Sequence, residues 1–166
     1  MKLASFVLLL MGAAALASAQ SPSQNCTPAG GILFTNVAAI ENRINTGVVY
    51  GDLAGTVSAA IIAGPTTVGF PAQGRQQIQF TVQHYWVTEK GENILFKPAT
   101  ATADTTSKDN VVAITYDNYV ATVSGGTGRF ANATGTIKFL GAVDFNLNHL
   151  VLRYSGQVCL AAGGAL

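Results

Sequence analysis

Residues 125–135 read GGTGRFANATG, and this stretch decides the fold. Four glycines in eleven residues mark backbone that turns tightly or adopts positive φ, which other residues avoid. Strand-like runs lie on both sides of it. We interpret the stretch as a structural crossing between two strands, with Phe130 packed as a plug. Direct ligand contact is the alternative role for its glycines, which are Gly125, Gly126, Gly128 and Gly135.

Alternation of apolar and polar residues is clearest upstream of this stretch. In residues 77–88 one face carries Ile78, Phe80, Val82, His84 and Trp86, and the other face carries Gln77, Gln79, Thr81, Gln83 and Tyr85. A period of two predicts a half-buried strand. After the stretch, Ile137, Phe139, Val143 and Phe145 alternate with polar or small residues, as do Leu150, Leu152, Tyr154 and Val158.

The whole chain reads as a series of strands. We expect strands at 32–38, 48–63, 77–88, 93–104, 112–121, 136–145 and 150–158, with a loop at 65–74, a hairpin turn at 89–92 and an edge or a bulge at Pro98. In residues 112–121 we expect one face of the strand to carry Val112, Ile114, Tyr116 and Val120. No amphipathic helix is evident. This pattern predicts an all-β fold, an eight-stranded antiparallel β-barrel or a sandwich, and a barrel leaves no exposed sheet edges.

The N-terminus has the pattern of a secretory signal peptide. Lys2 supplies the positive charge, residues 6–16 are apolar, and Ala17-Ser18-Ala19 is a small-residue cleavage site. A transmembrane anchor is disfavoured because the apolar run is about half of the ~20 residues that a spanning helix needs. We therefore expect a signal peptide at 1–19, an extended lead-in at 20–30 and a barrel domain at 31–166, in a protein that is secreted, extracellular or periplasmic.

Charge and cysteine content narrow the function classes. Without Lys2, eight of the nine basic residues remain, against eight acidic ones. A neutral chain has no basic patch for nucleic acid, and we expect no membrane partner after signal cleavage.

Cys26 and Cys159 lie near the two ends, and in an oxidising compartment two such cysteines predict one disulfide. The sequons at Asn25 and Asn132 match N-glycosylation sites, whose use depends on the source.

The glycine-rich stretch resembles an element of the allene oxide cyclase and dirigent barrels, G-G-[ST]-G-x-F-x-x-A-x-G before a late strand. Tyr50-Gly51-Asp52-Leu53 is similar to a Gly-Asp-Leu segment of allene oxide cyclases. The resemblance implies an eight-stranded antiparallel barrel of the calycin or allene oxide cyclase type, an interior for an apolar small molecule and, as in the plant families, trimers. Dirigents usually have Arg where this chain has Thr134, and no position here matches an allene oxide cyclase catalytic carboxylate.

Five aromatic side chains are candidates for lining a cavity, because their rings suit an apolar ligand and their polar tips can orient it. Plain core packing is the alternative for each, and for His84 the alternative to a general base is a hydrogen-bonded histidine near a strand end. The five ligand-binding candidates are Tyr50, His84, Trp86, Tyr116 and Tyr154.

Asp52 is the weak candidate for a catalytic carboxylate, because its glycine neighbours suggest crowded, inward-facing backbone. Asp117 and Asp144 fall on the polar faces of their strands and are expected outside, and His149 is expected in solvent. We expect no metal and no cofactor, because neither histidine has a partner at metal-ligand spacing and no phosphate loop is present.

Three functions remain open from the sequence. The first is a secreted barrel that binds or shields a small apolar ligand. The second is an enzyme, a cyclase- or isomerase-like barrel that steers a reactive substrate. The third is a structural or interaction module that forms a homo-oligomer. An enzyme should bring at least two titratable groups together in its lumen.

Overall fold

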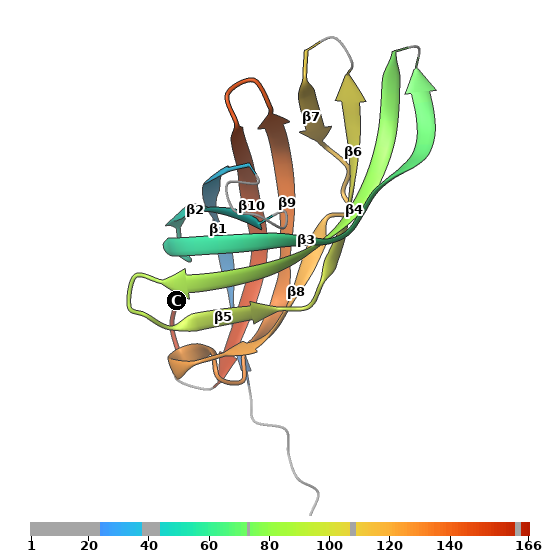
Figure 1. The fold of residues 1–166 in the computed structure, drawn as a ribbon. Helices are drawn as coiled ribbons and strands as arrows, with labels where there is room; N and C mark the ends of the chain where they lie inside the picture. The colour runs from blue at the N-terminus through green and yellow to red at the C-terminus, as the bar shows by residue number, and fades with distance from the viewer. Residues whose placement is uncertain (1–23, 38–43, 73, 107–108, 162–163) are drawn as a thin grey trace, which may run out of the picture.

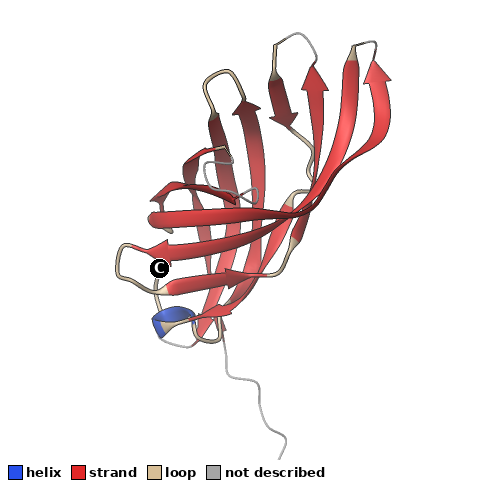
Figure 2. Ribbon diagram, viewed as in Figure 1, coloured by secondary structure: helices blue, strands red, loops and turns tan. Residues whose placement is uncertain are grey.

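The computed structural model describes residues 24–37, 44–72, 74–106, 109–161 and 164–166. Figure 2 shows strands throughout these residues and one short 3-10 helix, η1 (Gly128–Phe130). No helix among them is long and apolar enough to cross a membrane. The strands are β1 (Gln24–Asn36), β2 (Ile44–Gly51), β3 (Gly55–Ala72), β4 (Arg75–Thr88), β5 (Asn93–Phe96), β6 (Ala99–Thr106), β7 (Val111–Ile114), β8 (Val120–Gly126), β9 (Thr134–Asp144) and β10 (His149–Ala161).

The strands form one antiparallel sheet that closes on itself (Figure 1). β10, β1, β2, β3 and β4 pair in that order, and β10 also pairs with β9. Between β4 and β9 the circuit is completed by two strand pairs, β5 with β8 and β6 with β7. The result is a ring of eight strand positions, which confirms the predicted all-β, eight-stranded antiparallel architecture.

β5 and β6 are two pieces of one ring position, where one strand with an edge or a bulge at Pro98 was predicted. β5 pairs with residues 85–87 of β4, and β6 pairs with residues 75–82. Lys97 and Pro98 lie between the pieces, and the Lys97 N–H donates to the Thr122 carbonyl at 2.9 Å. Proline has no N–H to continue a ladder, which accounts for the break at this point.

β7 and β8 are likewise two pieces, and here the predicted alternation is wrong. β7 ends at Ile114, residues 115–119 leave the ladder, and β8 begins at Val120. Because the excursion shifts the parity, Val120 is 39% exposed while Ala121 and Tyr119 are buried. Within residues 115–119, the side chains of Tyr116 and Asn118 donate hydrogen bonds to Asp104 and Thr102 of β6.

The β3–β4 hairpin is longer than predicted. Residues 65–72 continue β3 instead of forming a loop, and the hairpin extends away from the ring in Figure 1. Register shifts between residues 61 and 72 absorb the irregular positions at Gly64, Pro65 and Gly69, so pairing resumes beyond them. The expected alternation of residues 77–88 is confirmed, with Val82, His84 and Trp86 buried.

The sheet also begins earlier than expected. Residues 24–30, predicted as part of an extended lead-in, belong to β1 and pair with β10 along its whole length. This register places Cys26 opposite Cys159, and the predicted disulfide between them is confirmed. The signal peptide at 1–19 and residues 20–23 lie outside the described residues.

The glycine-rich stretch closes one end of the ring. Phe130, in η1, is completely buried and packs as the predicted plug. Gly128 has φ +56°, and a Cβ there would lie 2.5 Å from the Glu92 carboxylate, which also accepts from the Arg129 N–H. At Gly126 a Cβ would lie 2.0 Å from the Asn93 carbonyl oxygen, so only glycine allows this approach. Gly125 and Gly135 also have positive φ. These contacts support the structural interpretation.

Candidate functional site

A cavity of about 270 Å³ lies inside the ring. Its walls come from β1, β2, β3, β4, β7, β9 and β10, together with Tyr119. Most of the lining is apolar, including Leu33, Ile61, Ile78, Phe80, Ile114 and Leu152. The polar side chains in the lining are Thr35, Asn45, His84 and Tyr119. We call this space the inner cavity.

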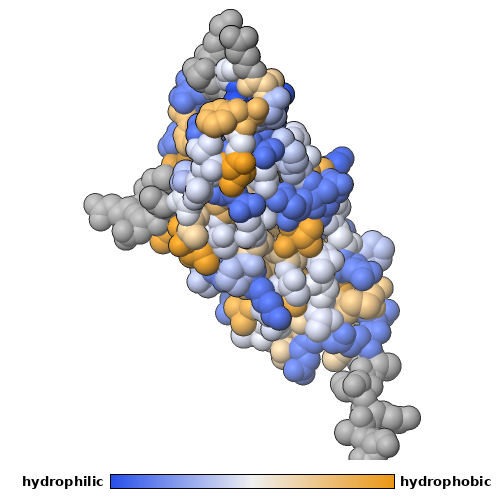
Figure 3. Space-filling view, turned by 90° about the vertical axis from the view of Figure 1, so that its right-hand side faces the viewer, coloured by the Kyte–Doolittle hydropathy of each residue, from blue (hydrophilic) through white to orange (hydrophobic). Residues whose placement is uncertain are grey.

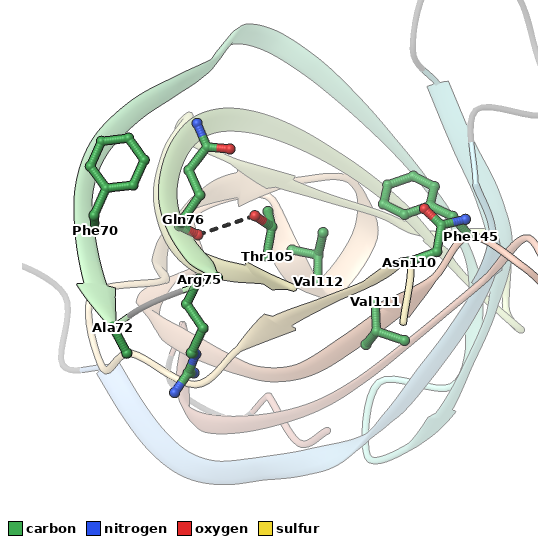
Figure 4. Close-up of a pocket in the computed structure, with 10 residues that line it drawn as sticks. Phe70, Ala72, Arg75, Gln76, Thr105, Asn110, Val111, Val112 and Phe145 are labelled. Atoms are coloured by element: carbon green, nitrogen blue, oxygen red, sulfur yellow. Dashed lines mark hydrogen bonds between the residues drawn. The ribbon is translucent and has the colours of Figure 1, made fainter. Parts of the chain in front are cut away.

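A wider hollow of about 750 Å³ adjoins it at the end of the ring that carries the β3–β4 hairpin. Figure 4 shows Phe70 on one side of this hollow and Phe145 on the other, with Gln76, Thr105 and Val112 between them. Val112 and Phe145 line both spaces, so we call the hollow the mouth of the inner cavity. Phe70 is 76% exposed, and Figure 3 shows hydrophobic patches near this end of the molecule.

His84 and Tyr119 form a buried pair in the lining of the inner cavity. His84 Nε2 and the Tyr119 hydroxyl are 2.7 Å apart, and the His84 ring also stacks on Phe139 with 4.8 Å between ring centroids. Burial lowers the pKa of His84 from 6.5 to about 4, and burial raises the pKa of Tyr119 above its ordinary value. Both side chains are therefore neutral at pH 7.

Two buried polar atoms of residues that line the cavity have no hydrogen-bond partner among the described residues. They are His84 Nδ1 and Thr35 Oγ1. Both residues are 1% exposed. Buried polar groups in native proteins are nearly always paired, with protein or with ordered water. An apolar cavity with a few such polar groups is the usual form of a small-molecule site.

Trp86 and Tyr154, two of the predicted ligand contacts, lie in the packed core next to the inner cavity and do not line it. The Trp86 ring meets Phe96, Phe139 and Tyr154 edge to face at 5.2–6.2 Å. The Tyr154 hydroxyl accepts a hydrogen bond from the Leu53 N–H at 3.1 Å. Phe139 touches both Trp86 and His84, so it links this aromatic core to the inner cavity.

Tyr50 and Tyr116 lie away from the inner cavity. Tyr50 is 61% exposed on β2. The Tyr116 hydroxyl donates to the Asp104 carboxylate at 3.0 Å, and Arg75 pairs with the same carboxylate at 2.6 Å. Of the five predicted ligand contacts, only His84 therefore lines the inner cavity.

The inward position expected for Asp52 is not observed. Asp52 is exposed, and its carboxylate accepts a hydrogen bond from the Gly30 N–H at 2.8 Å, which joins the turn after β2 to β1. Leu53, the next residue, takes the buried position at 2% exposure. The crowded backbone beside the glycines reflects close strand approach, and it leaves the carboxylate outside as a turn-stabilising group.

The remaining titratable candidates lie where expected. Asp117 is exposed and pairs with Lys138 at 2.7 Å, and Asp144 accepts from the N–H groups of Asn146 and Leu147. His149 is exposed and lies against Phe34. Within the described part of the chain, no three His, Cys, Asp or Glu side chains gather as they would around a metal ion.

Sequence reasoning missed Tyr119, Thr35 and Asn45. Tyr119 was hidden because residues 115–119 interrupt the alternation that was counted through them. Thr35 could have been found, because it shares parity with Leu33 in β1. Asn45 could not be assigned to the lining from the sequence, because its position depends on where β2 begins.

No family model matches this chain, and no curated protein matches it. Among solved structures, it is similar to the pterocarpan synthase dirigent protein GePTS1, with 17% sequence identity and a TM-score of 0.34. That match covers 91% of this chain and 99% of the other. Dirigents are one of the two barrel families that residues 125–135 resemble. The fold above rests on this chain's own strand pairings.

Proposed function

We propose that this protein is a secreted binding protein that holds a small, mostly apolar molecule inside its ring. The inner cavity carries this proposal, because it combines an apolar wall with a few buried polar groups and adjoins an open mouth. An apolar protein cavity of about 150 Å³ can hold benzene. A space of about 270 Å³ therefore suits a molecule of roughly two fused six-membered rings.

Secretion is supported by two features. The N-terminal pattern of Lys2, an apolar run and Ala17-Ser18-Ala19 is that of a cleaved signal. The Cys26–Cys159 disulfide joins the first and last strands, and such bonds persist mainly in oxidising compartments.

The binding experiment uses Trp86, the single tryptophan of the chain. Trp86 contacts Phe139, which stacks on His84 in the lining, so a bound molecule should change the tryptophan emission. We expect saturable titrations with apolar bicyclic probes. Ala59→Phe should fill the inner cavity and weaken binding at least about tenfold, a loss of about 1.4 kcal/mol.

The matched control is Ala60→Phe. Ala60 is the next residue of β3 and is partly exposed on the opposite face, so the same substitution adds the same side chain outside the cavity. Circular dichroism and melting curves should show that both variants fold. Equal binding by Ala59→Phe and Ala60→Phe, or no saturable binding by the wild type, contradicts the proposal.

A second candidate function is an enzyme of the cyclase or isomerase type. The observation that favours it is the convergence of His84 and Tyr119, two titratable groups 2.7 Å apart in the lining. A neutral His84 could accept a proton, but with a pKa of about 4 it is a weak base at neutral pH. Binding therefore ranks first. Turnover of a bound substrate that is lost in His84→Gln, while binding survives, would reverse this order.

A homo-oligomer is the third candidate. The outer faces of β1 and β2 carry exposed apolar side chains at Ile32, Phe34, Val48 and Tyr50, and the register places Ile32 beside Tyr50 and Phe34 beside Val48. Light scattering of the eluted protein distinguishes a monomer from a trimer. A stable trimer that dissociates in Phe34→Asp would support this candidate, and it is compatible with ligand binding inside each ring.

A further inference from the structure

The inner cavity offers a bound molecule mainly hydrocarbon. Apolar side chains of β1, β3, β4, β7, β9 and β10 surround the space. Among its polar side chains, Thr35 and His84 are 1% exposed and Asn45, which has an interaction of its own, is 7% exposed. His84 Nε2 is already paired with the Tyr119 hydroxyl. A polar group of a ligand that entered this space would lose its water without gaining a partner, which costs free energy.

The inward face of β4 connects the inner cavity to the mouth. Ile78 and Phe80 line the inner cavity, and Gln76, on the same face of the strand, lines the mouth. Thr105 of β6, the register partner of Gln76, also lines the mouth. Two residues of a strand span about 7 Å, so a ring system beside Ile78 places a group attached to it beside Gln76 and Thr105.

The polar side chains of the mouth are open to a bound group. Gln76 and Thr105 are half-buried and Asn110 is exposed. Figure 4 shows Gln76 and Thr105 between the rings of Phe70 and Phe145. Amide and hydroxyl groups supply both hydrogen-bond donors and acceptors. The mouth therefore provides the polar contacts that the inner cavity lacks.

The charge in the mouth is already balanced. Among the described residues that line it, Arg75 is the one with a formal charge, and its guanidinium lies 2.6 Å from the Asp104 carboxylate. Arg75 also has the strand parity opposite to that of the inward-facing Gln76. An anionic group in the mouth would compete with Asp104 for this cation. The mouth therefore suits a neutral group.

A sugar ring combines the properties that this lining calls for. It carries hydroxyl groups around its rim, which can bond the Gln76 and Asn110 amides and the Thr105 hydroxyl. It carries C–H groups on its faces, which can pack against the rings of Phe70 and Phe145. The mouth, at about 750 Å³, has room for a sugar.

We propose that the ligand is a glycoside whose apolar ring system fills the inner cavity and whose neutral sugar occupies the mouth. This inference rests on the proposed binding function and names the chemical class of the ligand. It assigns the mouth as a second subsite and Gln76 as a residue that determines specificity there.

The test uses three probes that share a naphthalene ring and an oxygen at its 2-position, which are 2-methoxynaphthalene, 2-naphthyl β-D-glucoside and 2-naphthyl sulfate. By titration calorimetry at pH 7.5, the wild type should bind the glucoside about tenfold more tightly than the methyl ether, the effect of one or two net hydrogen bonds. The sulfate should bind no more tightly than the methyl ether.

The possible results separate the two proposals. A glucoside that binds no more tightly than the methyl ether overturns the sugar subsite while the binding function stands. A sulfate that binds more tightly than the glucoside overturns the preference for a neutral group. Failure of all three probes to bind overturns both the subsite and the binding function.

Two variants locate the subsite. Gln76→Leu removes the amide and should reduce the preference for the glucoside about threefold or more, while the affinity for the methyl ether is unchanged. Its partner Thr67 is exposed and can bond water instead. Phe70→Ala should also reduce the preference about threefold, and because Phe70 is 76% exposed the fold does not depend on its ring.

The matched control is Gln79→Leu. Gln79 is an exposed residue of the same strand on its outer face, so this variant should keep the full preference for the glucoside. A full preference in both Gln76→Leu and Phe70→Ala contradicts the assignment of the mouth as the sugar subsite. The comparison of probes on the wild type needs no variant, so a variant that fails to fold does not prevent the test.

Discussion

The buried His84 should make the stability of this protein fall as the pH is lowered from 7.5 to 5. Burial lowers its pKa from 6.5 to about 4 in the folded protein, whereas the unfolded chain keeps the ordinary value. Above pH 6.5 the imidazole is neutral in both states, and its full contribution to stability is present. Between pH 6.5 and 4 the unfolded state binds a proton that the folded state does not, so the free energy of unfolding decreases.

The size of the effect follows from the two pKa values. At pH 5 the loss relative to pH 7.5 is about 2 kcal/mol, and it approaches about 3 kcal/mol below pH 4. For a domain of this size, 2 kcal/mol corresponds to a decrease of about 4–8 °C in the melting midpoint. Solvent does not screen the His84 ring, because the ring is buried.

Urea unfolding at pH 7.5, 6.5, 5.5 and 5 measures this loss. His84→Leu/Tyr119→Phe should remove most of the pH dependence in this window, because the titrating group is gone. The control His149→Asn removes the exposed histidine and should keep the wild-type dependence. A wild-type stability that is constant between pH 7.5 and 5, or an equal dependence in the double variant, refutes the assignment to His84.

Two further predictions concern the scaffold. Cys26 and Cys159 should resist alkylation in denaturant without reductant, and Cys26→Ala/Cys159→Ala should lower the melting midpoint by several degrees, because a disulfide that spans 133 residues constrains the unfolded chain by up to about 5 kcal/mol. Alkylation of both thiols contradicts this. Gly126→Val should destabilise the fold by more than about 1 kcal/mol through its contact with the Asn93 carbonyl. Gly30→Ala, where the nearest atom to a Cβ lies at 3.6 Å, is the control, and equal denaturant midpoints for both would show that Gly126 is not required.

The sequence predicts a strand and its inward face where apolar and polar residues alternate without interruption. In β4 the alternation through Val82, His84 and Trp86 places these side chains inside, because successive side chains of a strand point to opposite faces. The turn at 89–92 follows from Gly91, which has φ +79°. The disulfide follows from two cysteines and an expected oxidising compartment. Each of these depends on neighbouring residues or on a simple count.

The inner cavity depends on contacts between distant residues. Tyr119 reaches His84 because residues 115–119 leave the ladder between β7 and β8, and no periodic signal in those residues predicts this path. Asp52 points outward because Gly30, on a different strand, supplies its hydrogen bond. The register that aligns Asn45, Ala59 and His84 is set by the pairing of three strands. Sequence therefore determined the all-β character, the inward face of β4 and the disulfide. Tertiary structure decided which polar groups meet in the inner cavity, because pairing register is a property of the closed ring and not of any one strand.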